Sequence, residues 1–283
     1  MLKKAGVVLL SLTVLLGGAL FRNAKEQERQ QALMVKTADQ LLGTHFYMPR
    51  DDAEAVDMNL YLLDDGASHP LVINLHGGAF IAGDADTLDT QSDRISRAWG
   101  VHVATVNYKL ANGTYDIAYG TQEVTDTVKY FRTHATEYGI DPNEIFLLGY
   151  SAGAYHAMAS TLALQQEGLP VAGQIICYGF IKEVNDTYLA MDETARSSTA
   201  PALFLLADND PISDGSLTYQ QSLSDNGVPT QVQKYAGAKH GFIEENNPEY
   251  EVLKATSRSP EQELLARQAE DQIGSWIHST TEH

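Results

Sequence analysis

The stretch Ile145-Phe-Leu-Leu-Gly-Tyr-Ser-Ala-Gly-Ala154 decides the fold that we expect for this chain. Its first four residues are apolar and have the length of a buried β-strand. They lead into the turn Gly-Tyr-Ser-Ala-Gly over 149–153, and the residues that follow, up to Leu162, are typical of a helix. The pattern therefore predicts a strand, a sharp turn and a helix, with Ser151 in the turn.

The two glycines beside the serine have a steric purpose. Gly149 and Gly153 lack a Cβ atom, so the strand and the helix can pass close to each other while Ser151 takes a strained conformation. The Ser151 hydroxyl then stands above the carboxyl edge of the sheet, and the positive N-terminal end of the helix points at it.

Strand and helix patterns alternate on both sides of this stretch. Upstream, Val56–Leu62 alternates between apolar and polar residues, which predicts a half-buried antiparallel strand, and Leu71–Leu75 is a continuous apolar strand. We expect further strands at 101–107, 173–178, 202–207 and 231–235, and helices at 88–99, 117–138, 214–225 and 262–277. Such alternation predicts an α/β domain with a mostly parallel sheet covered by helices on both faces.

Composition narrows the classes of partner. The 283 residues suffice for one large domain, and a net charge of −18 argues against nucleic acid and anionic membrane surfaces. A small neutral substrate fits this charge better. Cys177 is the single cysteine and lies in an apolar run, so we expect a buried thiol and no disulfide within the chain. No zinc or calcium motif is present in the sequence, so no metal is predicted.

The N-terminus has the pattern of a targeting segment. Lys3 and Lys4 precede the apolar run Ala5–Phe21, which as a helix would span about 25 Å, slightly less than a bilayer core. We expect export, either as a secreted protein or as one tethered to the outer face of the membrane through residues 5–21. The predicted parts are a signal peptide or membrane anchor at 1–22, a polar helical linker or partial cap at 23–50, and the main domain at 51–283.

A serine hydroxyl is a weak nucleophile at neutral pH, so Ser151 needs a base and an acid that orients the base. Of the nine histidines, His240 lies in a glycine-flanked loop just beyond the last expected strand. The acid should follow the strand at 202–207, where Asp208 and Asp210 both stand. The residues alone leave both aspartates open.

A third feature is suited to binding negative charge. His76-Gly77-Gly78 follows the strand Leu71–Leu75, and glycines at a strand end let backbone N–H groups approach a developing oxyanion. The N–H of Ala152 is the expected third donor. Each such donor is typically worth about 3–4 kcal/mol in transition-state stabilisation.

Taken in order, the motifs resemble the esterase/lipase branch of the α/β-hydrolase superfamily, near the hormone-sensitive-lipase-like and bacterial carboxylesterases. They are His76-Gly-Gly-Ala-Phe80, Asn107-Tyr-Lys-Leu-Ala111, Gly149-Tyr-Ser-Ala-Gly153, Asp210-Pro-Ile-Ser-Asp214 and His240-Gly-Phe242. The resemblance runs from about Val56 to the C-terminus and implies the α/β-hydrolase fold, here with a minimal cap. It implies that Asp210, which precedes a proline, is the acid, and that Gly77 and Gly78 are oxyanion donors.

The sequence departs from the family pattern at two positions. Ala79 stands where a third glycine is common, and Lys109 stands where arginine is usual. We expect the first change to be tolerated, because the two preceding glycines are the expected donors.

The expected function is the cleavage of short-chain or acetyl carboxylic esters by a serine hydrolase, through an acyl-enzyme and without a cofactor. The expected catalytic residues are Ser151, Asp210 and His240. Aromatic residues beside the motifs are candidates for the walls of the substrate pocket: Phe80, Tyr150, Tyr178, Phe180 and Phe242. The alternatives are another acyl hydrolase of this fold, such as a lipase or peptidase, and a non-catalytic binding protein on a hydrolase scaffold.

Overall fold

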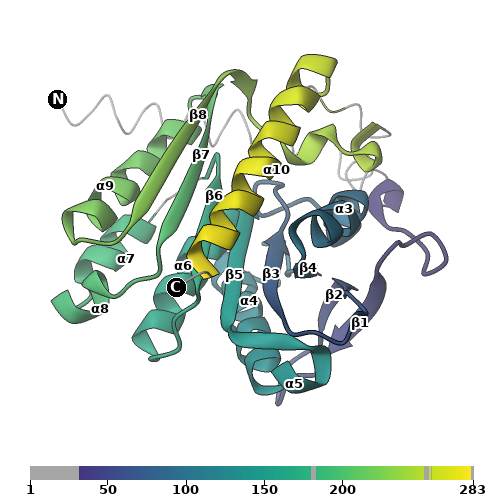
Figure 1. Ribbon diagram of the computed structural model, residues 1–283, viewed down its shortest axis with the longest axis horizontal. Helices are drawn as coiled ribbons and strands as arrows, with labels where there is room; N and C mark the ends of the chain where they lie inside the picture. Colours follow the sequence, from purple (N-terminus) through teal and green to yellow (C-terminus); the bar gives the residue numbers. More distant parts are fainter. Residues whose placement is uncertain (1–31, 180–182, 252–254, 256, 282–283) are drawn as a thin grey trace.

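The computed structural model describes residues 32–179, 183–251, 255 and 257–281. Its centre is an eight-stranded sheet with the strand order β1-β2-β4-β3-β5-β6-β7-β8 (Figure 1). The strands are β1 (Thr44–Met48), β2 (Val56–Tyr61), β3 (His69–Leu75), β4 (His102–Val106), β5 (Ile140–Tyr150), β6 (Gly173–Cys177), β7 (Ala202–Asn209) and β8 (Thr230–Lys239). β2 is antiparallel to both of its neighbours, and β3 to β8 run parallel. The predicted α/β class with a mostly parallel sheet is confirmed.

Helices cover both faces of the sheet. One face carries α4 (Ile117–Thr133), α6 (Ala152–Gln166) and α9 (Leu217–Asp225), and the other carries α3 (Asp89–Trp99) and α10 (Pro260–Thr281), the pair seen in front in Figure 1. The loops that the structure describes also contain four short 3₁₀ helices: η1 (Ala85–Leu88), η2 (Ser213–Ser216), η3 (Glu244–Asn246) and η4 (Pro248–Glu251). None of the helices in the described ranges is both long and apolar enough to cross a membrane.

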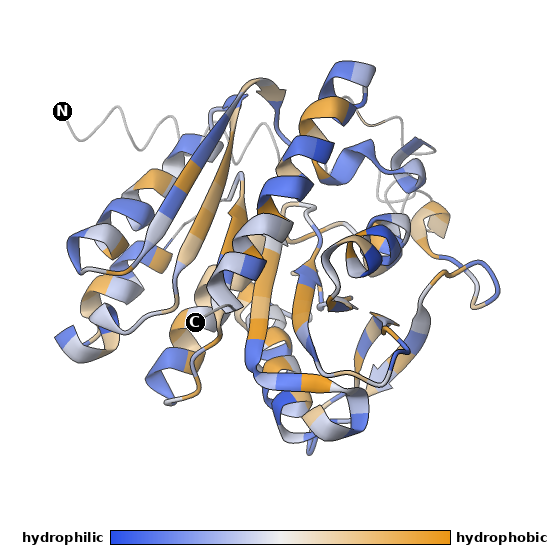
Figure 2. Ribbon diagram, in the orientation of Figure 1, coloured by the Kyte–Doolittle hydropathy of each residue, from blue (hydrophilic) through white to orange (hydrophobic). Residues whose placement is uncertain are grey.

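The central strands are apolar on both sides, and β5 shows why. Its side chains alternate between the two layers: Ile145 and Leu147 join the core under α4 and α6, while Phe146 and Leu148 join the core under α3 and α10. All four are fully buried, and each such side chain contributes about 1.5–3 kcal/mol. In Figure 2 the strands in the middle of the sheet are largely orange, the colour of hydrophobic residues. A continuous apolar run is therefore what a doubly covered strand requires.

The segment between β6 and β7, where a lid could be inserted, is small. Residues 183–200 form α7 (Val184–Ala190) and α8 (Glu193–Ser197). Tyr188 of α7 is fully buried, and its ring lies 5.6 Å from that of Tyr219 on α9. The two short helices thus pack onto the helical layer and form no domain of their own, as the expected minimal cap requires.

Two elements differ from the sequence-based expectation. Residues 44–48 do not continue a helical linker over 23–50: they form β1, antiparallel to β2 at the edge of the sheet. The residues of Thr-His-Phe-Tyr-Met are largely β-branched or aromatic, which suits an edge strand. The helix expected at 117–138 is interrupted at His134, where α4 ends and the short α5 (Ala135–Tyr138) follows. The signal peptide or anchor expected at 1–22 lies outside the described residues.

Candidate active site

Ser151 occupies the turn between β5 and α6 in a strained conformation, with φ 51° and ψ −110°. Such angles cost a residue with a side chain about 1–3 kcal/mol. A Cβ atom on Gly149 would lie 2.3 Å from the Gly153 carbonyl carbon, and one on Gly153 would lie 2.1 Å from the Leu75 oxygen. Both positions therefore require glycine. The Ser151 N–H donates to the Cys177 carbonyl of β6 at 3.0 Å, which fixes the turn to the neighbouring strand.

The structure brings three of the predicted residues into one chain of hydrogen bonds. The Nε2 atom of His240 lies 2.8 Å from Ser151 Oγ, and its Nδ1 atom lies 2.6 Å from Asp210 Oδ2. Because the Asp210 carboxylate can only accept, Nδ1 carries the proton, and Nε2 of the neutral ring accepts from the serine hydroxyl. The three side chains come from the carboxyl ends of β5, β7 and β8, which meet at one edge of the sheet (Figure 1).

The surroundings of His240 favour its protonated form. Burial lowers the pKa of His240, but the hydrogen bond and charge of Asp210 and the charges of Glu244 and Glu245 outweigh burial, so its pKa lies above the ordinary value. A base with a raised pKa accepts the serine proton more readily.

The two candidate aspartates occupy different environments. The Asp210 side chain is 1% exposed, and its second oxygen, Oδ1, accepts the Ile212 N–H at 2.9 Å. The Asp208 side chain is 47% exposed and points to Lys234, with 3.5 Å between Oδ1 and Nζ. The geometry therefore places Asp210, and not Asp208, against the histidine.

The loop after β3 presents its peptide groups in a fixed order. The Tyr108 hydroxyl donates to the His76 carbonyl at 2.7 Å, and His76 Nδ1 donates to the Gly77 carbonyl at 2.6 Å. The Gly78 carbonyl accepts from the N–H groups of Ile81 and Ala82 at 3.1 and 3.0 Å. Three successive carbonyls are thus held by partners.

This arrangement decides which N–H groups are free. In a trans peptide the N–H points away from the carbonyl of the same plane, so fixing the Gly77 and Gly78 carbonyls directs the N–H groups of Gly78 and Ala79 to the opposite side. Within the described residues these two groups and the N–H of Ala152 donate to no protein acceptor. The Gly77 N–H instead donates to Glu244 Oε2 at 2.8 Å. The expectation that Gly77 offers a free donor is therefore wrong, and Ala79 takes its place beside Gly78.

Glu244 is a member of the site that sequence reasoning did not assign to it, and His76, the first residue of the predicted oxyanion motif, supports the same loop. Burial lowers the pKa of His76 to about 4, so its ring is neutral, and it stacks on Tyr108 with 4.3 Å between the ring centres. The neutral ring supplies the Nδ1–H that holds Gly77. The available signal for Glu244 was its position four residues after His240.

Most of the expected aromatic walls are buried behind the site. Tyr150, Tyr178 and Phe242 are fully buried and cannot offer surface to a substrate, so their expected binding role is wrong. Tyr178 instead lies edge-on to the His240 ring at 5.2 Å and supports it. Phe80 keeps partial exposure and packs edge-on to Tyr155 at 5.3 Å. Phe180 lies outside the described residues.

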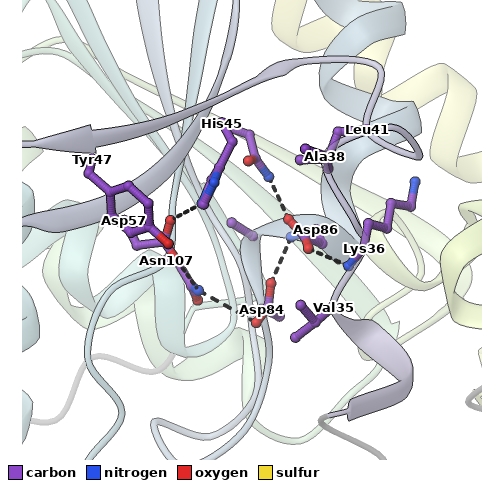
Figure 3. A pocket seen from close by; sticks show the side chains of 12 residues that line it. Val35, Lys36, Ala38, Leu41, His45, Tyr47, Asp57, Asp84, Asp86 and Asn107 are labelled. Carbon is purple, nitrogen blue, oxygen red and sulfur yellow. Dashed lines mark hydrogen bonds and ion pairs between the residues drawn. The ribbon is translucent and has the colours of Figure 1, made fainter.

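A polar cavity of about 170 Å³ lies elsewhere on the molecule, between β1, β2 and η1 (Figure 3). Its wall includes His45, which lies 2.5 Å from Asp57, and Asp86, which accepts the Lys36 N–H at 2.6 Å. None of Ser151, Asp210 and His240 lines it. Among the described residues no group of three or more His, Cys, Asp or Glu side chains is arranged to hold a metal ion.

Comparison with known proteins gives relatives that are named as ester-cleaving enzymes. The chain is 28% identical over 209 residues to an acetyl esterase of Salmonella typhi, covering 60% of this chain and 64% of that protein. It is 24% identical over 217 residues to an ethyl acetate hydrolase of Pseudomonas putida, covering 64% and 68% of the two chains. The matched region thus spans less than two thirds of the acetyl esterase.

Solved structures share the fold over nearly the whole chain. An arylesterase superimposes with a TM-score of 0.74 at 20% identity, covering 96% of this chain and 97% of the other. A thermostable carboxylesterase from a metagenomic library gives 0.70 at 21% identity, covering 90% and 94%. The family model described as alpha/beta hydrolase fold matches residues 72–197 and 182–244, more than half of the chain. The parallel sheet, the strained serine turn and this match together show that the chain belongs to the α/β-hydrolase family.

Proposed function

We propose that the protein is a serine hydrolase that cleaves carboxylic esters through an acyl-enzyme intermediate. The observation that carries the proposal is the chain of hydrogen bonds from Asp210 through His240 to Ser151, with the last residue in a strained turn. Free backbone N–H groups are available in the loop after β3 and at Ala152, the first residue of α6 and the residue next to Ser151. The relatives named as esterases support the same reaction class.

The reaction follows from the positions of the polar groups. Ser151 Oγ attacks the ester carbonyl while His240 Nε2 takes the hydroxyl proton, and the N–H groups of Gly78, Ala79 and Ala152 bind the resulting oxyanion. Collapse of the intermediate breaks the bond to the alcohol, which leaves with the proton from His240. Water then attacks the acyl-enzyme, again giving its proton to His240, and the acid is released with Ser151 restored. Asp210 keeps the imidazole oriented throughout.

A short acyl group is the substrate class that the cap supports. α7 and α8 lie on the helical layer, so within the described ranges little protein remains to enclose a long chain. Phe80 and the 40% exposed Ile81 are the apolar side chains of the loop beside the free N–H groups. The chain's net charge of −18 also favours a neutral ester.

The test is the turnover of p-nitrophenyl esters by wild type and by Ser151→Ala and His240→Ala. Each substitution should lower kcat by about 10⁴- to 10⁶-fold, because nucleophile and base act as a unit. A fluorophosphonate probe should label wild type and not Ser151→Ala. Labelling that persists without Ser151 would show that another residue is the nucleophile, and a wild type that neither reacts nor turns over ester would sink the proposed function.

We also propose that the N-terminal segment directs export. The support is the sequence pattern of Lys3 and Lys4 followed by the apolar run Ala5–Phe21. Fractionation of cells that express the full chain should place the protein outside the cytoplasm, and N-terminal sequencing should distinguish a cleaved signal from a retained anchor. An unchanged distribution after deletion of residues 5–21 would contradict export by this segment.

A further inference from the structure

A buried carboxylate lies directly behind the loop that carries the free N–H groups. Glu244 is 4% exposed and belongs to η3, four residues beyond His240 in the sequence. Its Oε2 atom accepts the Gly77 N–H at 2.8 Å. The contact joins the loop of the proposed base, after β8, to the loop after β3, across 167 residues of sequence. Neither the triad chemistry nor the helix contacts account for this glutamate.

The environment of Glu244 is costly for a charge. Burial raises its pKa to about 7, and the hydrogen bond from Gly77 is the strongest influence in the other direction. Tyr250, His240 and Glu245 act on its carboxyl group, and its backbone N–H donates to the Tyr178 hydroxyl at 3.3 Å. A buried carboxyl group with a perturbed pKa beside a candidate active site is itself a candidate for a functional role.

Glu244 completes the set of contacts that fix the peptide planes of the loop. The plane between His76 and Gly77 is held at its carbonyl by Tyr108 and at its N–H by Glu244. The next plane is held at its carbonyl by His76, which leaves the Gly78 N–H directed to the opposite side. Without Glu244 the first plane would be held at one end only, and its rotation would turn the Gly78 N–H with it.

We propose that Glu244 is a positioning residue of the oxyanion hole: its carboxyl group anchors the Gly77 N–H and so orients the donors Gly78 and Ala79. This inference rests on the proposed ester hydrolysis. It predicts a loss confined to the transition state, where the oxyanion forms, because the ground-state carbonyl draws less on these donors.

The experiment compares three variants in the full chain with p-nitrophenyl acetate, after titration of active sites with the fluorophosphonate. Glu244→Leu removes the acceptor, Glu244→Gln keeps an oxygen that can accept the Gly77 N–H, and Glu245→Gln is the matched control. Glu245 is the neighbouring glutamate on the same short helix, but its carboxylate accepts the Ser257 N–H and has no hydrogen bond to the described oxyanion loop.

We expect Glu244→Leu to lower kcat by about 10- to 100-fold with KM within about twofold, since one donor of an oxyanion hole is worth up to about 10³. The inhibition constant of a trifluoromethyl ketone, which forms a tetrahedral anionic adduct with the serine, should rise by the same factor. Glu244→Gln should stay within about threefold of wild type and Glu245→Gln within about twofold. A purely structural role would lower the number of titrated sites and leave kcat per site unchanged.

If Glu244→Leu does not fold, a second variant can test the same contact. A Cβ atom on Gly77 would lie 2.5 Å from Glu244 Oε1, at a backbone conformation open to alanine, so Gly77→Ala should displace the carboxylate and reproduce the loss. Wild-type kcat and ketone affinity in Glu244→Leu, or in Gly77→Ala where it stands in, would overturn the inference. So would an equal loss in Glu244→Gln, because charge would then matter and the N–H contact would not. In all these cases wild type still cleaves ester, so the proposed function stands.

Discussion

At the scale of single residues, the distinction between the two aspartates depends on burial. Asp208 lies near the end of β7 and reaches solvent and Lys234, whereas Asp210 follows the strand and is enclosed against His240. Asp210→Asn should lower kcat by up to about 10⁴-fold, because an amide at this place favours the wrong histidine tautomer. Asp208→Asn should change kcat little. Steady-state kinetics on both variants, with circular dichroism to show equal folding, checks the ranking, and the reverse order would move the acid to Asp208.

The proton on His240 should control activity and stability in opposite directions. Because only the neutral ring can take the serine proton, kcat/KM should rise with pH along a limb whose apparent pKa lies above about 6.5, the free imidazole value. The folded protein holds this proton more tightly than the unfolded chain does. Its contribution to stability is therefore complete below the ordinary pKa and is lost as pH rises through the raised one.

A pH–rate profile from pH 5 to 9 measures the first effect. Glu244 titrates within this pH range, since its pKa is raised to about 7, so the profile should be repeated with Glu244→Gln. The limb should persist in that variant. A rate that is flat from pH 5 to 8 would exclude a histidine base.

At the scale of elements, the sequence pattern predicted those strands whose own residues indicate how they are buried. β3 and β5 are continuous apolar runs because both of their faces are covered, and the nucleophile turn is set by Gly149 and Gly153. β1 was not predicted, because five residues at a sheet edge acquire their strand character from pairing with β2.

The parts of the site that sequence could not predict depend on partners far along the chain. Gly77 and Gly78 are equivalent as sequence letters, and only the contact with Glu244 separates the engaged N–H from the free one. Tyr150 adjoins the nucleophile in sequence, yet the alternation of side chains along β5 sends it into the core under α3 and α10. Tyr178, the residue after β6, joins the same core. Nearness to a motif is therefore a poor guide to which side chains line a pocket.

The small size of α7 and α8 should limit the acyl chain. Each methylene left in water forgoes about 0.8 kcal/mol of transfer free energy, so kcat/KM should stop rising once the pocket is full. We expect a maximum between acetate and butyrate in a series of p-nitrophenyl esters. Rates should show no jump at the solubility limit of the substrate. A steady rise through decanoate to palmitate, with activation at an emulsion surface, would indicate a lipase.

At the scale of the whole molecule, the site is distributed over the sheet. Its groups follow β3, β5, β7 and β8, and the two cores on either side of the sheet hold these strands in register. No single supersecondary unit contains both the nucleophile and the base. Activity should therefore disappear together with the fold and not before it, which parallel urea titrations of turnover and far-ultraviolet circular dichroism can compare.

The rate at which the single cysteine reacts with a thiol reagent can report how often the sheet opens. Cys177 is fully buried in β6, its carbonyl accepts the Ser151 N–H, and burial raises the pKa of its thiol well above the ordinary value. A thiol reagent can reach it only when the centre of the sheet opens. With a typical stability of at least about 5 kcal/mol, labelling should be at least about a thousandfold slower than for a free thiol. Each labelled molecule should also be inactive, because Ser151 has then lost the hydrogen bond from its N–H to the Cys177 carbonyl. The amount of bound reagent should therefore equal the number of inactivated molecules.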